Sequence, residues 1–209
     1  MARALTYKNL MDYKPVVLPF SGKWEASFGC PELKGSWLIW GNSGNGKTRF
    51  ALQLCKYLCQ FRKVAYNSLE EGCSESMKDA ARQVGMGEVE RRFLLLDMES
   101  KKELEKRLEA RKSPDIIFID SLQYFRLTMN DYERYKKKFP NKLFIFVSHA
   151  KGKDPKGSMA ESIRYDAFVK IWVEGYKAFP VSRYVTNGEI QPFTIYTKGA
   201  EDYWGNINK

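Results

Sequence analysis

Short apolar runs alternate with amphipathic stretches along the middle of the chain, from residue 36 to about residue 150. Short apolar runs are typical of buried strands, whereas apolar residues at three- and four-residue spacing indicate helices. The strands predicted in this way are 36–40, 63–69, 93–96, 116–120 and 143–147. The helices predicted between them are 49–58, 74–84, 100–111 and 122–138. This β-α repetition predicts an α/β fold with a mainly parallel central sheet flanked by helices on both faces.

The pattern changes after residue 150. Residues 151–157 combine lysines with glycine and proline, which predicts a mobile basic loop. Strands are expected at 167–173, 182–185 and 192–196, with Asn187-Gly188 as a hairpin turn. These later strands predict an antiparallel C-terminal extension of one edge of the sheet.

The start of the chain has little periodicity. Proline and glycine punctuate residues 1–35, so we expect an N-terminal arm there and one core domain over residues 36–209. No apolar run is long enough to cross a bilayer, and the first eight residues lack the apolar stretch of a signal peptide. The sequence therefore predicts a cytoplasmic protein with no membrane partner.

The link between the first predicted strand and helix carries a phosphate-binding pattern, G-x-x-x-x-G-K-T. Its residues are Gly41, Asn42, Ser43, Gly44, Asn45, Gly46, Lys47 and Thr48. The glycines let the backbone turn its N–H groups inward around an anion, and the helix N-terminus favours negative charge. We expect Lys47 to reach the β- and γ-phosphates of ATP, and the Thr48 hydroxyl to hold Mg²⁺. The expected ATP-binding set extends to Arg49, which follows directly.

Acidic residues stand where two other predicted strands end. Asp120 follows four apolar residues, which places its carboxylate at the edge of the sheet where ligands bind and predicts a Mg²⁺ role. The alternative is that Asp120 caps the following helix. Glu70 ends the second strand and could polarise a water for attack on the γ-phosphate. Glu71 is adjacent, but neighbouring side chains point in different directions, so we expect only one of the two to serve.

The fifth strand ends in Ser148-His149, the chain's single histidine. Polar side chains at this edge could contact the γ-phosphate or the attacking water, so His149 is a candidate sensor of nucleotide state.

Together these residues resemble the RecA-type ATPases, the group that includes RecA, RadA, KaiC and the DnaB-like replicative helicases. The resemblance rests on the strand and P-loop, Ser68-Leu69-Glu70, Ile119-Asp120 and Ser148-His149, and it extends over residues 28–197. It implies a RecA-like P-loop ATPase fold and a catalytic role for Glu70. It also implies a homo-oligomeric ring or filament with ATP at subunit interfaces. The short chain looks like a minimal core of the phage or mobile-element type.

The resemblance implies two further catalytic residues. The stretch 177–183 is similar to the part of RecA that supplies lysines to the ATP of a neighbouring subunit, which makes Lys177 and Arg183 candidates. RecA has a further lysine two positions before the one matching Lys177, whereas this chain has Gly175.

The net charge of +10 favours a polyanionic partner, and the resemblance makes that partner DNA, single-stranded by preference. A DNA surface would use eight basic residues: Arg134, Lys136, Lys137, Lys138, Lys142, Lys151, Lys153 and Lys156. A solvated helix face is the alternative for these charges. Two other functions stay open, namely a KaiC-like nucleotide-dependent switch that acts on a protein partner, and a small-molecule kinase.

Overall fold

The computed structural model describes residues 4–185 and 189–207 of the chain. The strands are β1 (Gly35–Gly41), β2 (Val64–Ser68), β3 (Phe93–Asp97), β4 (Ile116–Asp120), β5 (Leu143–Lys151), β6 (Asp154–Pro155), β7 (Val169–Glu174), β8 (Lys177–Ser182) and β9 (Phe193–Thr194). The helices are α1 (Tyr7–Met11), α2 (Gly22–Phe28), α3 (Lys47–Leu58), α4 (Glu75–Val84), α5 (Lys101–Glu109), α6 (Leu122–Phe125), α7 (Met129–Lys138), α8 (Ser158–Asp166) and α9 (Thr197–Ile207), with a 3₁₀ turn at Met86–Val89.

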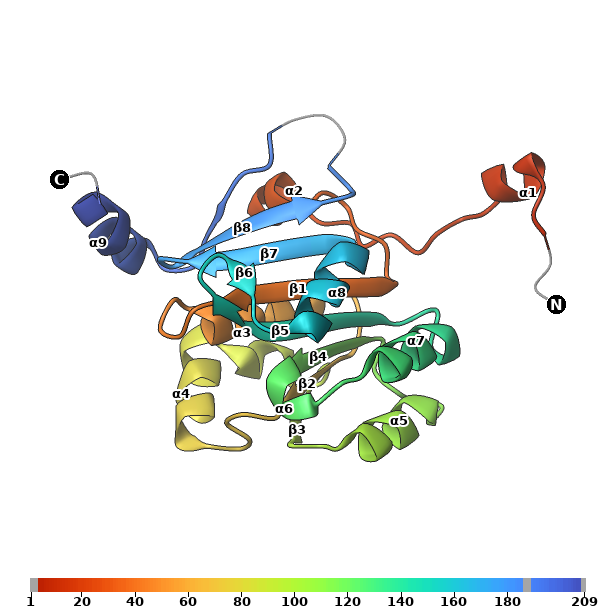
Figure 1. Ribbon diagram of the computed structural model, residues 1–209, viewed down its shortest axis with the longest axis horizontal. Coiled ribbons are helices and arrows are strands. Elements are labelled where there is room, and N and C mark those ends of the chain that lie inside the picture. The colour runs from red at the N-terminus through yellow and green to blue at the C-terminus, as the bar shows by residue number, and fades with distance from the viewer. Residues whose placement is uncertain (1–3, 186–188, 208–209) are drawn as a thin grey trace.

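One twisted sheet runs through the molecule in the order β3-β2-β4-β5-β1-β7-β8-β9 (Figure 1). The first six strands of this order are parallel, and β8 and β9 join antiparallel. Because β1 lies between β5 and β7, the loop after β1 opens at the centre of the sheet. The predicted α/β class, with a mainly parallel sheet and an antiparallel C-terminal extension, is confirmed.

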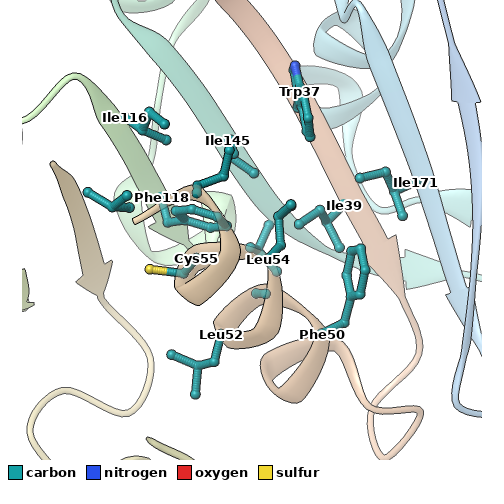
Figure 2. Packing of buried hydrophobic residues seen from close by; sticks show 14 of the residues in the cluster. Trp37, Ile39, Phe50, Leu52, Leu54, Cys55, Ile116, Phe118, Ile145 and Ile171 are labelled. Atoms are coloured by element: carbon teal, nitrogen blue, oxygen red, sulfur yellow. The ribbon is translucent and has the colours of Figure 1, made fainter. Parts of the chain in front are cut away.

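Helices cover the sheet on both faces. Buried side chains of α2, α3 and α4 form one core with one face of the sheet, and those of α5, α6, α7 and α8 form a second core with the other face. Figure 2 shows Phe50 and Leu54 of α3 facing the strand that carries Ile39. Burial of such side chains contributes roughly 1.5–3 kcal/mol each, so α3 is held firmly with its N-terminus at the loop after β1.

The predicted helix over 122–138 is wrong as a single element, because it is broken into α6 and α7. Arg126 has a left-handed backbone (φ 49°) that ends α6. Thr128 then starts α7 with a capping box, in which its hydroxyl accepts from the N–H of Asp131 and the Asp131 carboxylate accepts from the N–H of Thr128. Thr128 and Asp131 have the sequence spacing of a capping box, and this cap starts a new helix although the helical periodicity continues on both sides.

The strand expected at 182–185 is also misplaced. β8 covers Lys177–Ser182 and pairs with β7 through a two-residue turn at Gly175-Tyr176. Both turn residues have positive φ (51° and 57°), as the tight twist-matching hairpin turn requires. Tyr176 is an unusual residue for this backbone, which is why turn chemistry did not reveal it. The Asn187-Gly188 turn lies outside the described residues.

Residues 151–157 form structure rather than a free loop. β5 continues to Lys151 and turns back into β6, with Ala150 opposite Pro155 and Lys151 opposite Asp154. The indole N–H of Trp40 donates to the carbonyl of Lys153 at 2.9 Å. This β5–β6 hairpin is therefore fastened to β1 directly beside the P-loop.

The two ends of the chain behave differently. Leu18, Phe20, Trp24 and Phe28 are buried in the core on the α3 side, whereas α1 has no buried residue and stands away from the body (Figure 1). α9 lies at the opposite end of the long axis (Figure 1), and neither it nor α8 follows from the periodicity. The division of the chain at residue 35 stays a prediction.

Candidate nucleotide site

The P-loop links β1 to α3 in the manner that the sequence predicted. Gly46 has φ 91°, and a side chain there would press on the ring of Tyr176 at 3.1 Å. Gly41 approaches the carbonyl oxygen of Val173 so closely that a Cβ would lie 2.2 Å from it. Only glycine fits both places, and a loop rich in glycine can turn its backbone N–H groups toward a bound anion.

A cavity of about 580 Å³ opens beside the P-loop. It lies where the parallel strands end, which is the ligand-binding edge of open α/β sheets. Its lining is Asn42, Ser43, Gly44, Gly46, Lys47, Thr48, Arg49, Ser68, Glu70, Glu71, Asp120, His149, Ala150, Lys156 and Tyr176. The structure thus brings the P-loop, both predicted carboxylates and the histidine to one cavity. Tyr176 also lines the cavity without any sequence signal, and so do Glu71, which the sequence offered only as an alternative to Glu70, and Lys156, which it assigned to a DNA surface.

The Lys47 side chain folds back onto the P-loop backbone. Its Nζ donates to the carbonyl of Asn42 at 2.9 Å, which holds the side chain across the loop. Burial lowers the pKa of Lys47, and the charges of Asp120 and Glu70 act against that shift. The ammonium therefore stands between the phosphate cradle and the acidic side of the cavity.

The Asp120 carboxylate forms no ion pair with the described residues. Burial raises its pKa to about 6, and the neighbouring charges of Glu70 and Glu71 add to the rise. The hydroxyl of Tyr66 donates to its Oδ2, which opposes the rise, as does the charge of Lys47. A buried carboxylate beside other carboxylates gains most from a bound cation.

Glu70 is paired with His149. Its Oε2 lies 3.0 Å from Nε2 of the histidine, and the Ser121 hydroxyl reaches the same oxygen at 3.5 Å. Glu71 turns to α4, where its carboxylate accepts from the hydroxyl of Ser76 at 2.6 Å. Both glutamates line the cavity, but only Glu70 is held by residues from two other strand ends.

Ser148 does not reach the cavity. It is fully buried, and its hydroxyl accepts a hydrogen bond from the side-chain amide Nε2 of Gln123 at 2.9 Å. The carbonyl oxygen of the Gln123 side chain accepts from the N–H of His149 at 3.3 Å. Gln123 therefore fixes the strand end that presents His149. Nothing in the sequence pattern singled it out, because it is an ordinary polar position of a short helix.

The far wall of the cavity joins the P-loop to the β7–β8 turn. Asn45 Oδ1 accepts from the N–H of Gly175 at 2.8 Å, and Tyr176 lines the cavity next to Gly46. The Arg49 guanidinium lies 4.6 Å from the ring centre of Tyr196, and its Nε has no hydrogen-bond partner among the described residues.

Lys177 and Arg183 do not line this cavity in their own chain. Lys177 Nζ lies 5.6 Å from the ring centre of Trp204, and the Arg183 guanidinium lies 4.8 Å from that of Phe168. Because β8 runs away from the cavity edge, Lys177 stands at that edge and Arg183 at the opposite one, roughly 20 Å apart at strand spacing. Their action on a neighbouring subunit stays a prediction.

The eight basic residues proposed for DNA do not form one surface. Arg134, Lys136, Lys137, Lys138 and Lys142 lie at or before the start of β5, whereas Lys151, Lys153 and Lys156 lie beyond its far end. That separation is roughly 30 Å at strand spacing. Three of the first group form ion pairs with Glu105, Glu109, Asp131 or Asp166, and Lys142 binds the carbonyl of Pro114.

The residues present fit a magnesium–nucleotide complex. The cradle at Gly44 and Gly46 and the ammonium of Lys47 suit phosphates, and the Thr48 hydroxyl and Asp120 carboxylate supply hard oxygen donors. No group of three His, Cys, Asp or Glu side chains among the described residues could hold a metal. Mg²⁺ takes few protein ligands and completes its shell with phosphate and water, so one hydroxyl and one carboxylate would suffice to hold it.

No protein-family model matches the chain, and no curated protein matches it in sequence. Among solved structures, the KaiC-like protein PH0186 from Pyrococcus horikoshii OT3 matches with a TM-score of 0.58 and 18% identity, over 86% of this chain and 93% of that chain. The flagellar accessory protein FlaH from Methanocaldococcus jannaschii gives 0.56 and 17%, over 86% and 84%. The ATP synthase subunit NeqB from Nanoarchaeum equitans gives 0.53 and 9%, over 76% and 50%.

These similarities establish that the chain has a RecA-like P-loop ATPase fold. The fold and the P-loop together support nucleotide binding as the role of the cavity. Among the described residues, no helix is both long and apolar enough to cross a membrane.

Proposed function

We propose that the chain binds Mg²⁺–ATP in the cavity beside the P-loop and hydrolyses it. The observation that carries this proposal is the convergence of Lys47, Asp120, Glu70 and His149 on one cavity of about 580 Å³. Each comes from a different strand end or helix start, so their convergence is a property of the fold.

Each side chain has a distinct part in this chemistry. Lys47 leaves the Asn42 carbonyl and binds the β- and γ-phosphates, while Thr48 and Asp120 hold the ion. Mg²⁺, when bound, neutralises the charge that develops on the phosphate oxygens. Glu70 accepts the proton of the attacking water, and His149 keeps its carboxylate oriented toward that water.

Glu70→Gln tests this assignment. Loss of the base is expected to slow phosphate release from ATP by about 10²–10⁴-fold, whereas binding of a fluorescent ATP analogue stays within about threefold. Glu71→Gln is the matched control, because it neutralises the adjacent carboxylate that faces Ser76. Equal loss in both variants, or no loss in Glu70→Gln, overturns the role of Glu70.

We propose further that hydrolysis is coupled to single-stranded DNA in a self-assembled ring or filament. The support is the net charge of +10 and the position of Lys151, Lys153 and Lys156 on the β5–β6 hairpin, whose last lysine lines the nucleotide cavity. This hairpin could report DNA to the nucleotide through His149, which β5 also carries. The basic residues near the start of β5 are left out of this surface, since three of the five are paired with acids.

The alternative is a nucleotide-dependent switch that acts on a protein, and the fold similarity to a KaiC-like protein supports it equally. Phosphate release with and without oligothymidine separates the two. Stimulation that is lost in Lys151→Ala/Lys153→Ala, but kept in Lys137→Ala/Lys138→Ala, supports DNA coupling. Rates that DNA leaves unchanged at low and high salt support the switch.

The proposed oligomer has a test of its own. Lys177 is the candidate that stands at the nucleotide edge, so a mixture of Lys47→Ala and Lys177→Ala chains should regain part of the activity that each lacks alone. Sedimentation with and without Mg²⁺–ATP measures the assembly directly. A protein that hydrolyses ATP as a monomer contradicts this part of the proposal.

A further inference from the structure

A tyrosine lies beneath the nucleotide cavity, inside the core. Tyr66 stands in the middle of β2, is fully buried, and stacks on Phe118 of β4 with ring centres 5.5 Å apart and planes at 18°. Its hydroxyl is the one polar group of this side chain, and it donates to Oδ2 of Asp120.

The strand register brings these two groups together. β2 and β4 are parallel neighbours, with Tyr66 opposite Phe118 and Ser68 opposite Asp120. Side chains two residues apart share one face of a sheet, so Tyr66 and Asp120 point to the same side. A tyrosine is long enough to pass its paired neighbour and reach the next side chain along the strand.

The hydrogen bond constrains Asp120. A buried phenol hydroxyl without an acceptor costs about 1–3 kcal/mol, and Asp120 is its acceptor among the described residues. Rotation of the carboxylate away from Tyr66 would incur that cost. Oδ2 is therefore committed to the core, and Oδ1, which carries no hydrogen bond from the described residues, remains for a ligand in the cavity that Asp120 lines.

We propose that Tyr66 is a positioning residue that locks Asp120 in the rotamer presenting one oxygen to the metal of the bound nucleotide. This inference rests on the proposed function, since it concerns how the same site takes its cation. A hydrogen bond that fixes a ligating side chain commonly changes metal affinity by about 10–100-fold when removed.

The molecule supplies a matched control in Tyr132. This buried tyrosine of α7 likewise donates its hydroxyl to an aspartate, Asp166, and shares a further hydrogen bond of 2.9 Å with the Ser36 hydroxyl, at a place where no residue of the nucleotide cavity takes part. Tyr66→Phe and Tyr132→Phe remove the same hydroxyl and retain the ring. A loss of stability in both variants reports the lost buried hydrogen bonds, whereas a change in the Mg²⁺ dependence of binding that is confined to Tyr66→Phe reports the nucleotide site.

The experiment titrates Mg²⁺ into each variant mixed with methylanthraniloyl-ATP and follows the fluorescence of the bound analogue. Tyr66→Phe is expected to raise the Mg²⁺ concentration for half-maximal response by about tenfold, with binding in EDTA unchanged. Tyr132→Phe is expected to match the wild type in both conditions. Melting temperatures of the two variants verify that both are folded at the assay temperature.

Two outcomes overturn the inference. One is an unchanged Mg²⁺ midpoint in Tyr66→Phe, and the other is an equal fall in binding with and without Mg²⁺, which indicates a structural role alone. A wild type whose analogue binding ignores Mg²⁺ contradicts the proposed function instead. If Tyr66→Phe is too unstable to titrate at the assay temperature, the same titration of Tyr66→Phe, Tyr132→Phe and the wild type in the cold decides by the same two criteria.

Discussion

The molecule contains the same tyrosine–aspartate hydrogen bond twice, but the pKa values of the two carboxyls are shifted in opposite directions. In each, a tyrosine hydroxyl donates to an aspartate: Tyr66 to Asp120, and Tyr132 to Asp166. Burial acts to raise the pKa of both carboxyls. At Asp166 the hydrogen bonds from Lys136 and Tyr132 outweigh burial and lower the pKa, whereas at Asp120 burial prevails and the pKa reaches about 6.

The difference lies in the third partner. The carboxylate of Asp166 forms an ion pair with the ammonium of Lys136, with Nζ 2.5 Å from Oδ2. Asp120 has Glu70 and Glu71 near it, while Lys47 is bonded to the P-loop carbonyl of Asn42. The Tyr132–Asp166 pair connects α7 to α8, whereas the Tyr66–Asp120 pair leaves a carboxylate without a paired cation at the ligand-binding edge of the sheet. The same tyrosine–aspartate hydrogen bond can therefore belong to a structural contact or to a functional site, depending on the charged groups that surround the aspartate.

The largest expected effect comes from Lys47→Ala. If Lys47 serves the phosphates, its loss should reduce phosphate release by about 10³-fold or more and weaken analogue binding, because the P-loop loses its ammonium. Stability should change by less than about 1 kcal/mol, measured by urea denaturation. If Lys47 were instead the cation of Asp120, as Lys136 is of Asp166, the variant would unfold more readily. Lys102→Ala, an exposed position of α5, is the control.

Asp120→Asn is expected to have a smaller effect, and it should stabilise the folded protein rather than destabilise it. The pKa of Asp120 is raised to about 6 in the folded protein, so the folded protein binds this proton more tightly than the unfolded chain does. Protonation of Asp120 therefore stabilises the fold at low pH, and this stabilisation is lost as pH rises through about 6. The amide has no charge to bury and should be more stable above pH 7 by about 1–3 kcal/mol, with the difference vanishing toward pH 4. Urea denaturation across this pH range measures it.

Mg²⁺-dependent binding should be lost in the same Asp120→Asn variant. A variant that is less stable than the wild type at pH 8 shows that Asp120 already has its cation, and the contrast with Asp166 then fails.

Lys136→Met has the smallest expected effect. Asp166 has a lowered pKa, so its contribution is present at neutral pH and is lost as pH falls through the folded-state pKa. The side chains of Lys136 and Asp166 are 38% and 41% exposed, so solvent screening limits the loss at pH 7 to less than about 1 kcal/mol. The loss should shrink in 0.5 M salt and below about pH 4, and phosphate release should not change. A salt-independent loss would indicate packing of the lysine stem instead.

The sequence predicts structure well where a few adjacent residues define that structure. The P-loop is such a case, because glycine conformation and the helix start at Lys47 are set within eight residues. Asp120 and Glu70 were located by the apolar strands before them, and the fold places both at the cavity. Periodicity does not predict the break at Arg126, where two helices follow one another, or the turn at Tyr176, where a tyrosine has positive φ.

Fold class, the phosphate cradle and the edge on which its acids lie were determined by the sequence itself, because strand and helix periodicity and short turn motifs act over a few residues. Tertiary structure alone decided which side chains meet there. Tyr66 and Asp120 are 54 positions apart, and they touch because β2 pairs with β4 in one register. Likewise, the length of β5 separates the basic residues that lie close in sequence. Strand order and register are long-range choices of packing, and no local pattern encodes them.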